Sequence, residues 1–203
     1  MMYFTPVETT FGHLTLIHRG TDSAGVVAIL LPKTKKESLQ EVKSRFPKAE
    51  QGSVDSLIPF KGMLIDYFDG ARVKFPIDVL DLSICYPFQI EVLKAEWSIP
   101  YGKTASYSCV AKKIHSTAYR AVGNALSRNP FPIIIPCHRA IRSDRTLGGF
   151  QGGLKMKRRI LEMEGVEFDS LGRVAEEYVQ SSLDPLFDYF QSPKYLNNFN
   201  GTF

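Results

Sequence analysis

The chain has 203 residues, of which 44% are hydrophobic and 23% are charged, an ordinary globular composition that allows one large domain or two small ones. No apolar run approaches the ~18 residues that suggest a membrane span, and no charged-then-apolar leader is present, so we expect the protein not to be secreted. The three cysteines, Cys85, Cys109 and Cys137, lack paired spacing, which argues against a disulfide framework and for a reducing compartment.

The net charge of +4 conceals an asymmetry along the chain. Residues 101–165 hold 12 basic and 3 acidic side chains, whereas residues 1–100 hold 11 basic and 12 acidic ones. A polyanion is the natural partner of such a segment, because cationic side chains neutralise phosphates and release counterions. The alternative is a solvated basic surface, and charge alone favours that alternative.

The first 85 residues carry both strand and helix signals. The polar stretch 19–23 separates two β-rich segments and predicts a turn. Thr34 and Glu37 have the spacing of a capping box, which predicts a helix directly after them. The expected elements are strands at 4–18 and 24–31, a helix to about Phe46, a helix over 55–68 and a strand near 71–75. Together they predict a small α+β domain over residues 1–85.

The rest of the chain reads mainly as helix. Pro87 begins the first predicted helix, and Asn129-Pro130 ends the third, because the residue before proline disfavours the α region. Residues 114–116 join the second and third helices in a helix-turn-helix arrangement. The expected helices are 87–97, 106–115, 117–128 and 154–164. They predict a second domain over residues 86–168, followed by an extension over 169–203 whose role the sequence does not give.

A short segment offers the clearest catalytic candidate. Three β-branched residues, 133–135, predict a fully buried stretch, and Pro136-Cys137-His138-Arg139 follows at once. A buried cysteine is usually an inert small hydrophobe. Here an imidazole adjoins the thiol, and a histidine can lower a thiol pKa, so Cys137 is a candidate nucleophile. Adjacent side chains rarely face each other, so we expect Cys137 and His138 to communicate through a water.

An acid is needed to fix the tautomer of His138, and the last predicted helix supplies a candidate. Met156, Ile160, Leu161 and Met163 define its buried side, and Glu164 lies four residues beyond Ile160. An acid on such a face requires a partner. The alternative is a frayed, solvated side chain at the helix end.

These segments occur in a recognisable order. Ile99-Pro100-Tyr101-Gly102, Ser106-Tyr107, residues 120–125, Asn129-Pro130, the Cys137 segment and residues 148–153 resemble the O6-alkylguanine-DNA alkyltransferase family, closely over about 86–166. The resemblance implies a ribonuclease-H-like α+β N-terminal domain and a mainly helical, winged-helix-like C-terminal domain with a helix-turn-helix. It also implies single-turnover, irreversible transfer of an alkyl group from O6-methylguanine, and more weakly from O4-methylthymine, to Cys137.

The resemblance assigns roles to residues at matching positions. The implied catalytic residues are Cys137, His138, Glu164, Tyr107 and Asn129, with Tyr107 as proton donor to the leaving base and Asn129 as a hinge. The implied DNA-binding residues are Arg120, Tyr119, Ala121, Gly123, Asn124 and Arg128. The implied substrate pocket consists of Tyr107, Pro136, Arg139, Leu147, Gly148, Phe150 and Gln151. Gln151 is bulkier than the residue many relatives carry, which puts tolerance of large O6 adducts in doubt.

The resemblance further implies a monomer that binds double-stranded DNA through the minor groove and flips out the alkylated guanine. No cofactor is expected, and the cytoplasm, nucleoid or nucleus is the expected location. No zinc site is expected either, because the N-terminal domain has one cysteine, Cys85, and His13 and His18 lie far from it in the sequence.

Several of these residues also have a purely structural explanation. Without the resemblance, a buried place in a helix-turn-helix core is the better interpretation of Tyr107, and the small residues after Arg120 also suit tight helix packing. Residues 155–159 suggest a solvated helix face rather than a nucleic-acid patch.

Three rival functions remain. One is a protein that recognises alkylated bases without repairing them, although such proteins replace the reactive cysteine. A transcription factor would have no use for a cysteine relay, and a cysteine hydrolase would need an oxyanion hole that nothing in the sequence marks.

Overall fold

The computed structural model, which describes residues 1–20 and 25–183, begins with a three-stranded antiparallel meander. The hairpin between the first two strands turns at Gly12, whose φ of +115° and distance to the Lys33 carbonyl leave no room for a side chain. A short fourth strand runs parallel to the first, so the sheet order is β3-β2-β1-β4. The strands are β1 (Met2–Thr9), β2 (Gly12–Arg19), β3 (Val26–Lys33) and β4 (Glu50–Gln51).

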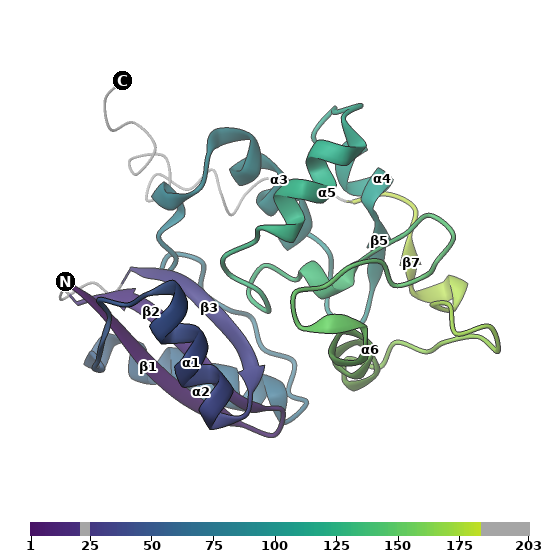
Figure 1. Ribbon diagram of the computed structural model, residues 1–203. Coiled ribbons are helices and arrows are strands. Elements are labelled where there is room, and N and C mark those ends of the chain that lie inside the picture. Colours follow the sequence, from purple (N-terminus) through teal and green to yellow (C-terminus); the bar gives the residue numbers. More distant parts are fainter. Residues whose placement is uncertain (21–24, 184–203) are drawn as a thin grey trace.

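Two helices cover the two faces of this sheet (Figure 1). Helix α1 (Lys35–Arg45) begins with the capping box that the sequence predicts, Thr34 and Glu37 each bonding the other's backbone N–H. A 3-10 turn, η1 (Asp55–Leu57), leads into α2 (Ile58–Phe68), which accepts Pro59 in its first turn. The predicted α+β organisation is confirmed.

The strand predicted near residues 71–75 is wrong. This stretch is an irregular loop, followed by the short 3-10 turn η2 (Leu82–Ile84). The ring of Phe75 packs against Phe60 and Tyr67 at centroid distances of 6.1 and 5.7 Å. The hydrophobic side chain is therefore buried without strand pairing.

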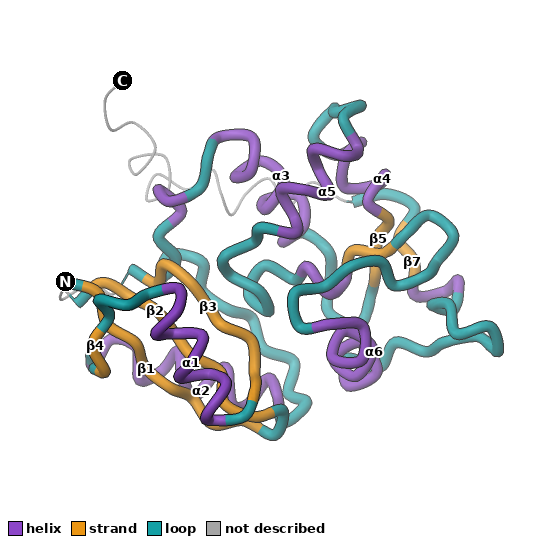
Figure 2. The backbone as a smooth tube through the Cα atoms, in the orientation of Figure 1, coloured by secondary structure: helices purple, strands orange, loops and turns teal. Residues whose placement is uncertain are grey.

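Residues 1–85 form the first lobe and residues 86–183 the second, whose regular structure is mainly helical (Figure 2). Helices α4 and α5 pack against each other across a turn in which His115 has a φ of 53°, as expected for a helix-turn-helix. Within the described part of the chain, no helix has the length and apolarity to cross a membrane. The helices are α3 (Pro87–Trp97), α4 (Tyr107–Lys113), α5 (Tyr119–Ser127) and α6 (Gly153–Met163).

A small parallel sheet connects the second lobe to residues beyond the predicted domain boundary at 168. Its order is β6-β5-β7, and Thr104 and Ala105 pair with Val179 and Gln180. Residues 169–183 are thus part of this lobe, while residues 184–203 of the predicted extension lie outside the described residues. The elements are β5 (Thr104–Ser106), the 3-10 turn η3 (Cys137–Arg139), β6 (Ala140–Ile141), the 3-10 turn η4 (Glu176–Tyr178) and β7 (Val179–Gln180).

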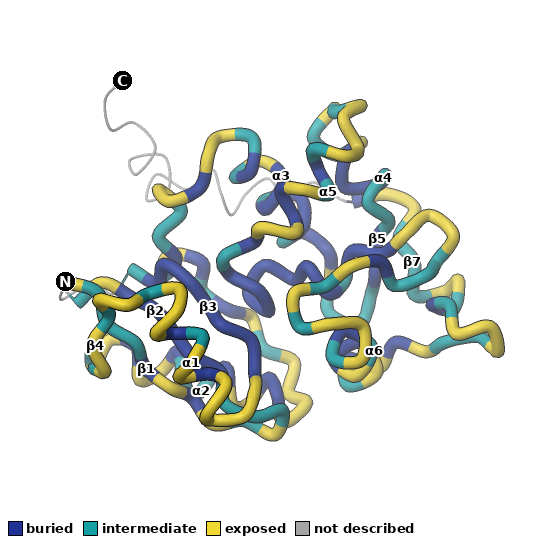
Figure 3. Tube along the Cα trace, in the orientation of Figure 1, coloured by how far each residue is buried: buried dark blue, intermediate teal, exposed yellow. Residues whose placement is uncertain are grey.

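The two lobes share one hydrophobic core. Phe131, Ile133–Ile135 and Ile160 from the second lobe pack among side chains of β1–β3 and α2. The backbone N–H of Ile29 in β3 also donates to the Pro130 carbonyl at 2.8 Å. Figure 3 shows buried backbone where β3 approaches the second lobe. The segment that precedes Cys137 is therefore held by both lobes.

Phe131→Ala should lower the free energy of unfolding by about 3–5 kcal/mol, because Phe131 is fully buried in the shared core and its loss leaves a cavity. Urea denaturation followed by circular dichroism measures this change. Leu154→Ala is the control, since Leu154 is 54% exposed and should change stability by about 0.5 kcal/mol or less. Equal effects of the two substitutions would contradict a core shared by the lobes.

Candidate active site

Cys137 opens the short 3-10 turn η3 and lines a pocket. Cys137 is only 7% exposed, and its backbone N–H donates to the Ile135 carbonyl at 2.8 Å. The pocket has a volume of about 450 Å³. The thiol is thus shielded from bulk water but can be reached by a group that fills the pocket.

The turn before Cys137 is strained and is fixed by Asn129. Ile133 has a φ of 77°, a conformation that costs a β-branched residue about 1–3 kcal/mol. The Asn129 amide donates to the Ile135 carbonyl at 2.8 Å, and its side-chain oxygen accepts the Phe131 N–H at 2.9 Å. The three β-branched residues therefore form a buried turn, and Asn129 ties its two ends to the end of α5.

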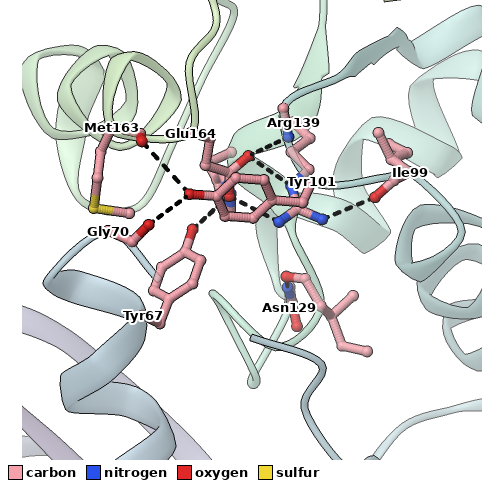
Figure 4. Close-up of polar contacts among 11 residues, drawn as sticks. Tyr67, Gly70, Ile99, Tyr101, Asn129, Arg139, Met163 and Glu164 are labelled. Atoms are coloured by element: carbon pink, nitrogen blue, oxygen red, sulfur yellow. Dashed lines mark hydrogen bonds and ion pairs between the residues drawn. The ribbon is translucent and has the colours of Figure 1, made fainter. Parts of the chain in front are cut away.

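Glu164 gathers three side chains around its carboxylate (Figure 4). His138 Nε2 lies 2.9 Å from Oε1, and the Tyr67 hydroxyl donates to the same oxygen at 2.6 Å. Arg139 makes a bidentate contact, Nη2 to Oε1 at 2.7 Å and Nε to Oε2 at 2.9 Å. The carboxylate is buried and paired, as the sequence requires of an acid on the apolar face of the last helix.

The charges around Glu164 decide the tautomer of His138. Burial would raise the pKa of the Glu164 carboxyl, but the charges and hydrogen bonds of His138 and Arg139 outweigh burial and hold that pKa far below its usual value. Burial also lowers the pKa of His138, against the charge of Glu164. An ionised carboxylate only accepts hydrogen bonds, so a neutral imidazole carries its proton on Nε2. Nδ1, which has no partner among the described residues, is left as a base.

The thiol of Cys137 is protonated at rest. Burial raises its pKa to about 12, the charge of Glu96 adds to that rise, and a hydrogen bond from Asn129 opposes it. A standing thiolate is therefore absent at neutral pH. The nucleophile must be generated when a base such as His138 accepts the thiol proton.

Residues from four segments of the chain line the pocket. Predicted members Tyr107, Gly148, Phe150 and Gln151 do line it. A side chain at Gly148, whose φ is +67°, would lie 2.8 Å from the Tyr107 hydroxyl oxygen, so the ring and the loop fit only because this residue is glycine. The lining residues that the prediction omitted are Gly123, Leu126, Ser127, Cys137, Arg142 and Gly149.

Three predicted pocket residues lie elsewhere. The Arg139 guanidinium donates to the Glu164 carboxylate and to the Ile99 carbonyl, the latter at 2.8 Å. Pro136 is buried at the start of η3, where it fixes the backbone before Cys137. Leu147 packs with the apolar cluster around Leu161. Their contribution is to hold the pocket rather than to line it.

The predicted DNA-binding residues fall on α5 and its C-terminal end. Tyr119, Arg120, Asn124 and Arg128 are exposed. Tyr119 is 50% exposed, so it points outward rather than into the core. Ala121 and Gly123 are half-buried, and Gly123 also lines the pocket. One helix thus offers its surface to solvent beside the pocket mouth.

Three buried polar residues were missed by the sequence reasoning: Tyr67, Glu96 and Lys157. The solvated face predicted over residues 155–159 is wrong at Lys157, which is fully buried and donates to the carbonyls of Ala140 and Gly149 at 2.6 and 3.2 Å. Its spacing from Ile160, Leu161 and Glu164 places it on their face, a signal present in the sequence. Glu96 likewise follows Val92 at helical spacing, whereas no local pattern marks Tyr67.

A metal has no evident site here. Within residues 1–20 and 25–183, no three histidine, cysteine, aspartate or glutamate side chains gather in a way that could hold an ion.

Glu164→Gln should destabilise the protein by about 3–5 kcal/mol at neutral pH, because it leaves Arg139 buried without its counter-charge. The pKa of Glu164 is lower in the folded than in the unfolded chain, whose ordinary value is 4.5, so its contribution exists above that value and is lost as pH falls below it. Urea unfolding at several pH values should show the wild-type advantage shrinking below about pH 4.5. Glu162→Gln, at an exposed ion pair, is the control and should show no such trend.

Comparison with known proteins agrees with the sequence resemblance. Residues 87–166 match the family described as 6-O-methylguanine DNA methyltransferase, DNA binding domain. A methylated-DNA–protein-cysteine methyltransferase of Methanothermobacter thermautotrophicus is 45% identical over 145 residues, which are 71% of this chain and 77% of that protein. The solved Mycobacterium tuberculosis O6-methylguanine methyltransferase has a TM-score of 0.64 at 35% identity, covering 81% of this chain and 93% of its own. For Mycobacterium tuberculosis OGT in complex with DNA the TM-score is 0.65 at 33% identity, with 80% and 92% covered. This chain belongs to the methylated-DNA–protein-cysteine methyltransferase family.

Proposed function

We propose that this protein repairs DNA by transferring the alkyl group of O6-methylguanine, and more slowly that of O4-methylthymine, to Cys137. The observation that carries the proposal is a buried thiol that lines a pocket and is followed in sequence by a histidine. The Glu164 contact orients this histidine, and its Nδ1 has no partner within residues 1–20 and 25–183. The product is a thioether, which has no leaving group comparable to guanine. Each molecule therefore acts once, and no diffusible cofactor is needed because the acceptor is part of the chain.

The reaction begins with removal of a proton from Cys137. The proton passes through one water to Nδ1 of His138, and Glu164 stabilises the resulting imidazolium. The sulfur then attacks the alkyl carbon, the carbon–O6 bond breaks, and its electron pair moves into the guanine ring. Tyr107 gives its hydroxyl proton to the ring nitrogen, so guanine leaves as a neutral base. Burial, followed by the charges of Glu96 and Cys137, raises the pKa of Tyr107 to about 12, which keeps that proton in place until it is needed.

The exposed face of α5 is the proposed DNA surface. Arg120, Asn124 and Arg128 lie on it, and the small residues Ala121 and Gly123 allow close approach. We propose that a monomer places this helix in the minor groove and flips the damaged base into the pocket beside it, with Arg120 filling the vacated space. The crystallised complex of Mycobacterium tuberculosis OGT with DNA supports this partner. The protein described here would act in the cytoplasm, nucleoid or nucleus.

We also infer the finer fold assignments. A ribonuclease-H-like first domain is supported by the order β3-β2-β1-β4 with a parallel β1–β4 pair. A winged-helix-like second domain is supported by the α4–α5 pair and the small β6-β5-β7 sheet.

Recognition of alkylated bases without repair is the remaining alternative. It shares the DNA surface and the pocket, and it differs in needing no reactive thiol. The retained Cys137 and the adjacent His138, which is paired with Glu164, favour transfer.

Incubation with a duplex that contains one O6-methylguanine should add one methyl group per protein molecule. Intact mass followed by peptide mapping should place it on Cys137. Cys137→Ala should abolish the gain and leave DNA affinity largely unchanged, while Cys109→Ala, at another buried free cysteine, should react normally. Tight binding of the lesion by the wild-type protein without any mass gain would instead support the recognition-only alternative.

Arg120→Ala should slow repair in duplex DNA about tenfold more than it slows reaction with free O6-benzylguanine, because only the duplex requires a base to be flipped. Single-turnover rates on the two substrates measure the difference. Lys36→Ala, which removes one exposed positive charge from the first lobe, is the control. If Arg120→Ala slows both reactions equally, the flipping role is wrong.

Gln151→Ala should speed transfer from bulky O6 adducts relative to transfer from O6-methylguanine. The Gln151 side chain donates to the carbonyls of Ser127 and Asn129 at 3.1 and 2.8 Å, and so ties the pocket loop to the end of α5. Loss of this tie should raise the rate ratio of O6-benzylguanine to O6-methylguanine about fivefold, the equivalent of one hydrogen bond of ~1 kcal/mol. Gln180→Ala, at a residue that does not line the pocket, should leave the ratio unchanged.

A further inference from the structure

Glu96 is an acid in a place built for an apolar side chain. It lies on α3 one helical turn after Val92 and one before Ile99, and all three residues are almost fully buried. Neither carboxylate oxygen has a hydrogen-bond partner among the described residues. Burial of an unpaired polar group opposes folding, so a leucine would stabilise this position better. A role outside stability is the natural explanation.

The surroundings of Glu96 belong to the reaction site. Four titratable or charged groups interact with it from other elements: Lys157 on α6, Tyr107 on α4, and Cys137 and Arg139 on η3. Lys157 is fully buried and donates to the Gly149 carbonyl, and its Nζ lies 6.0 Å from the centre of the Tyr107 ring. Tyr107, Cys137 and Gly149 all line the pocket. The ammonium group is therefore buried close to the reacting groups, and Glu96 is buried on α3, which packs against α4, the helix that begins at Tyr107.

We propose that Glu96 is a positioning residue for alkyl transfer, which acts by its charge and through Lys157 on the ionisation of Cys137 and on proton donation by Tyr107. The inference rests on the proposed function and adds a residue that the relay of Cys137, His138 and Glu164 does not contain. Glu96 need not touch the substrate. A carboxylate near the pocket opposes a thiolate, whereas a neutral carboxyl leaves the field of the Lys157 ammonium group uncompensated and favours a thiolate.

The charge on this pair changes within the working range of the protein. Burial raises the pKa of Glu96 to about 8, and burial lowers the pKa of Lys157 to about 8. As pH rises through that value, Glu96 gains a negative charge and Lys157 loses a positive one. Both changes oppose ionisation of Cys137, and a negative Glu96 also holds the proton on Tyr107. The usual rise of a thiol reaction with pH should therefore flatten above about pH 8.

The test is the pH profile of single-turnover transfer from free O6-benzylguanine, which removes DNA binding from the measurement. Glu96→Gln mimics the neutral carboxyl, so its rate should lie within about twofold of wild type near pH 6.5 and exceed wild type by about tenfold near pH 9. Glu91→Gln on the same helix is the matched control, since its side chain is 59% exposed and should leave the profile unchanged.

Glu96→Leu separates this role from a structural one. Its midpoint of thermal unfolding should exceed that of wild type, and the excess should grow from about pH 4.5 to about pH 8, the window in which the folded chain must keep Glu96 protonated. Its rate profile should match that of Glu96→Gln. Profiles of both variants that run parallel to wild type at every pH would overturn the inference and leave the proposed function intact. A wild-type protein that gains no alkyl group at Cys137 would overturn the proposed function first.

Discussion

The buried carboxylate of Glu164 is the interaction on which the rest of the site depends. It fixes His138 by one oxygen, binds Arg139 through both, and accepts the hydroxyl of Tyr67 from the first lobe. A buried ion of this kind is tolerated only when all its partners are in place. The geometry of the catalytic histidine is therefore coupled to correct packing of the two lobes, because Tyr67 arrives on α2 while Glu164 ends α6.

A second set of contacts joins the DNA-facing helix to the thiol. The last carbonyls of α5 and those just after it are bonded by two glutamine side chains, Gln89 from α3 and Gln151 from the pocket loop. Asn129 then carries the connection into the strained turn at Ile133. Few of these contacts depend on charge, so they persist when salt weakens the binding of a polyanion.

Sequence reasoning reached the helices, the family and the Cys137–His138–Glu164 set, because each has a local or motif-level signal. It missed Tyr67, since a residue in one lobe that serves a site in the other leaves no trace in its own neighbourhood. The resemblance implied that Arg139 lines the pocket, and the sequence beside Cys137 does not reveal that this guanidinium turns toward Glu164 instead. Lys157 and Glu96 did carry a signal, their spacing on apolar helix faces, but charged residues on helices are usually solvated and that expectation prevailed.

The contact between Ile29 and Pro130 has a consequence for the sheet of the first lobe. Strand β3 is an edge strand, and an uncovered edge offers unpaired N–H and C=O groups to any passing chain. Pro130 accepts the N–H of Ile29 in the middle of the strand, and Leu80 forms an isolated bridge to Val26, the first residue of the strand. The opposite edge is the two-residue strand β4, which is too short to recruit a neighbour. The second lobe thus covers part of this edge, and a first lobe produced by itself would expose the Ile29 N–H to strand-to-strand association.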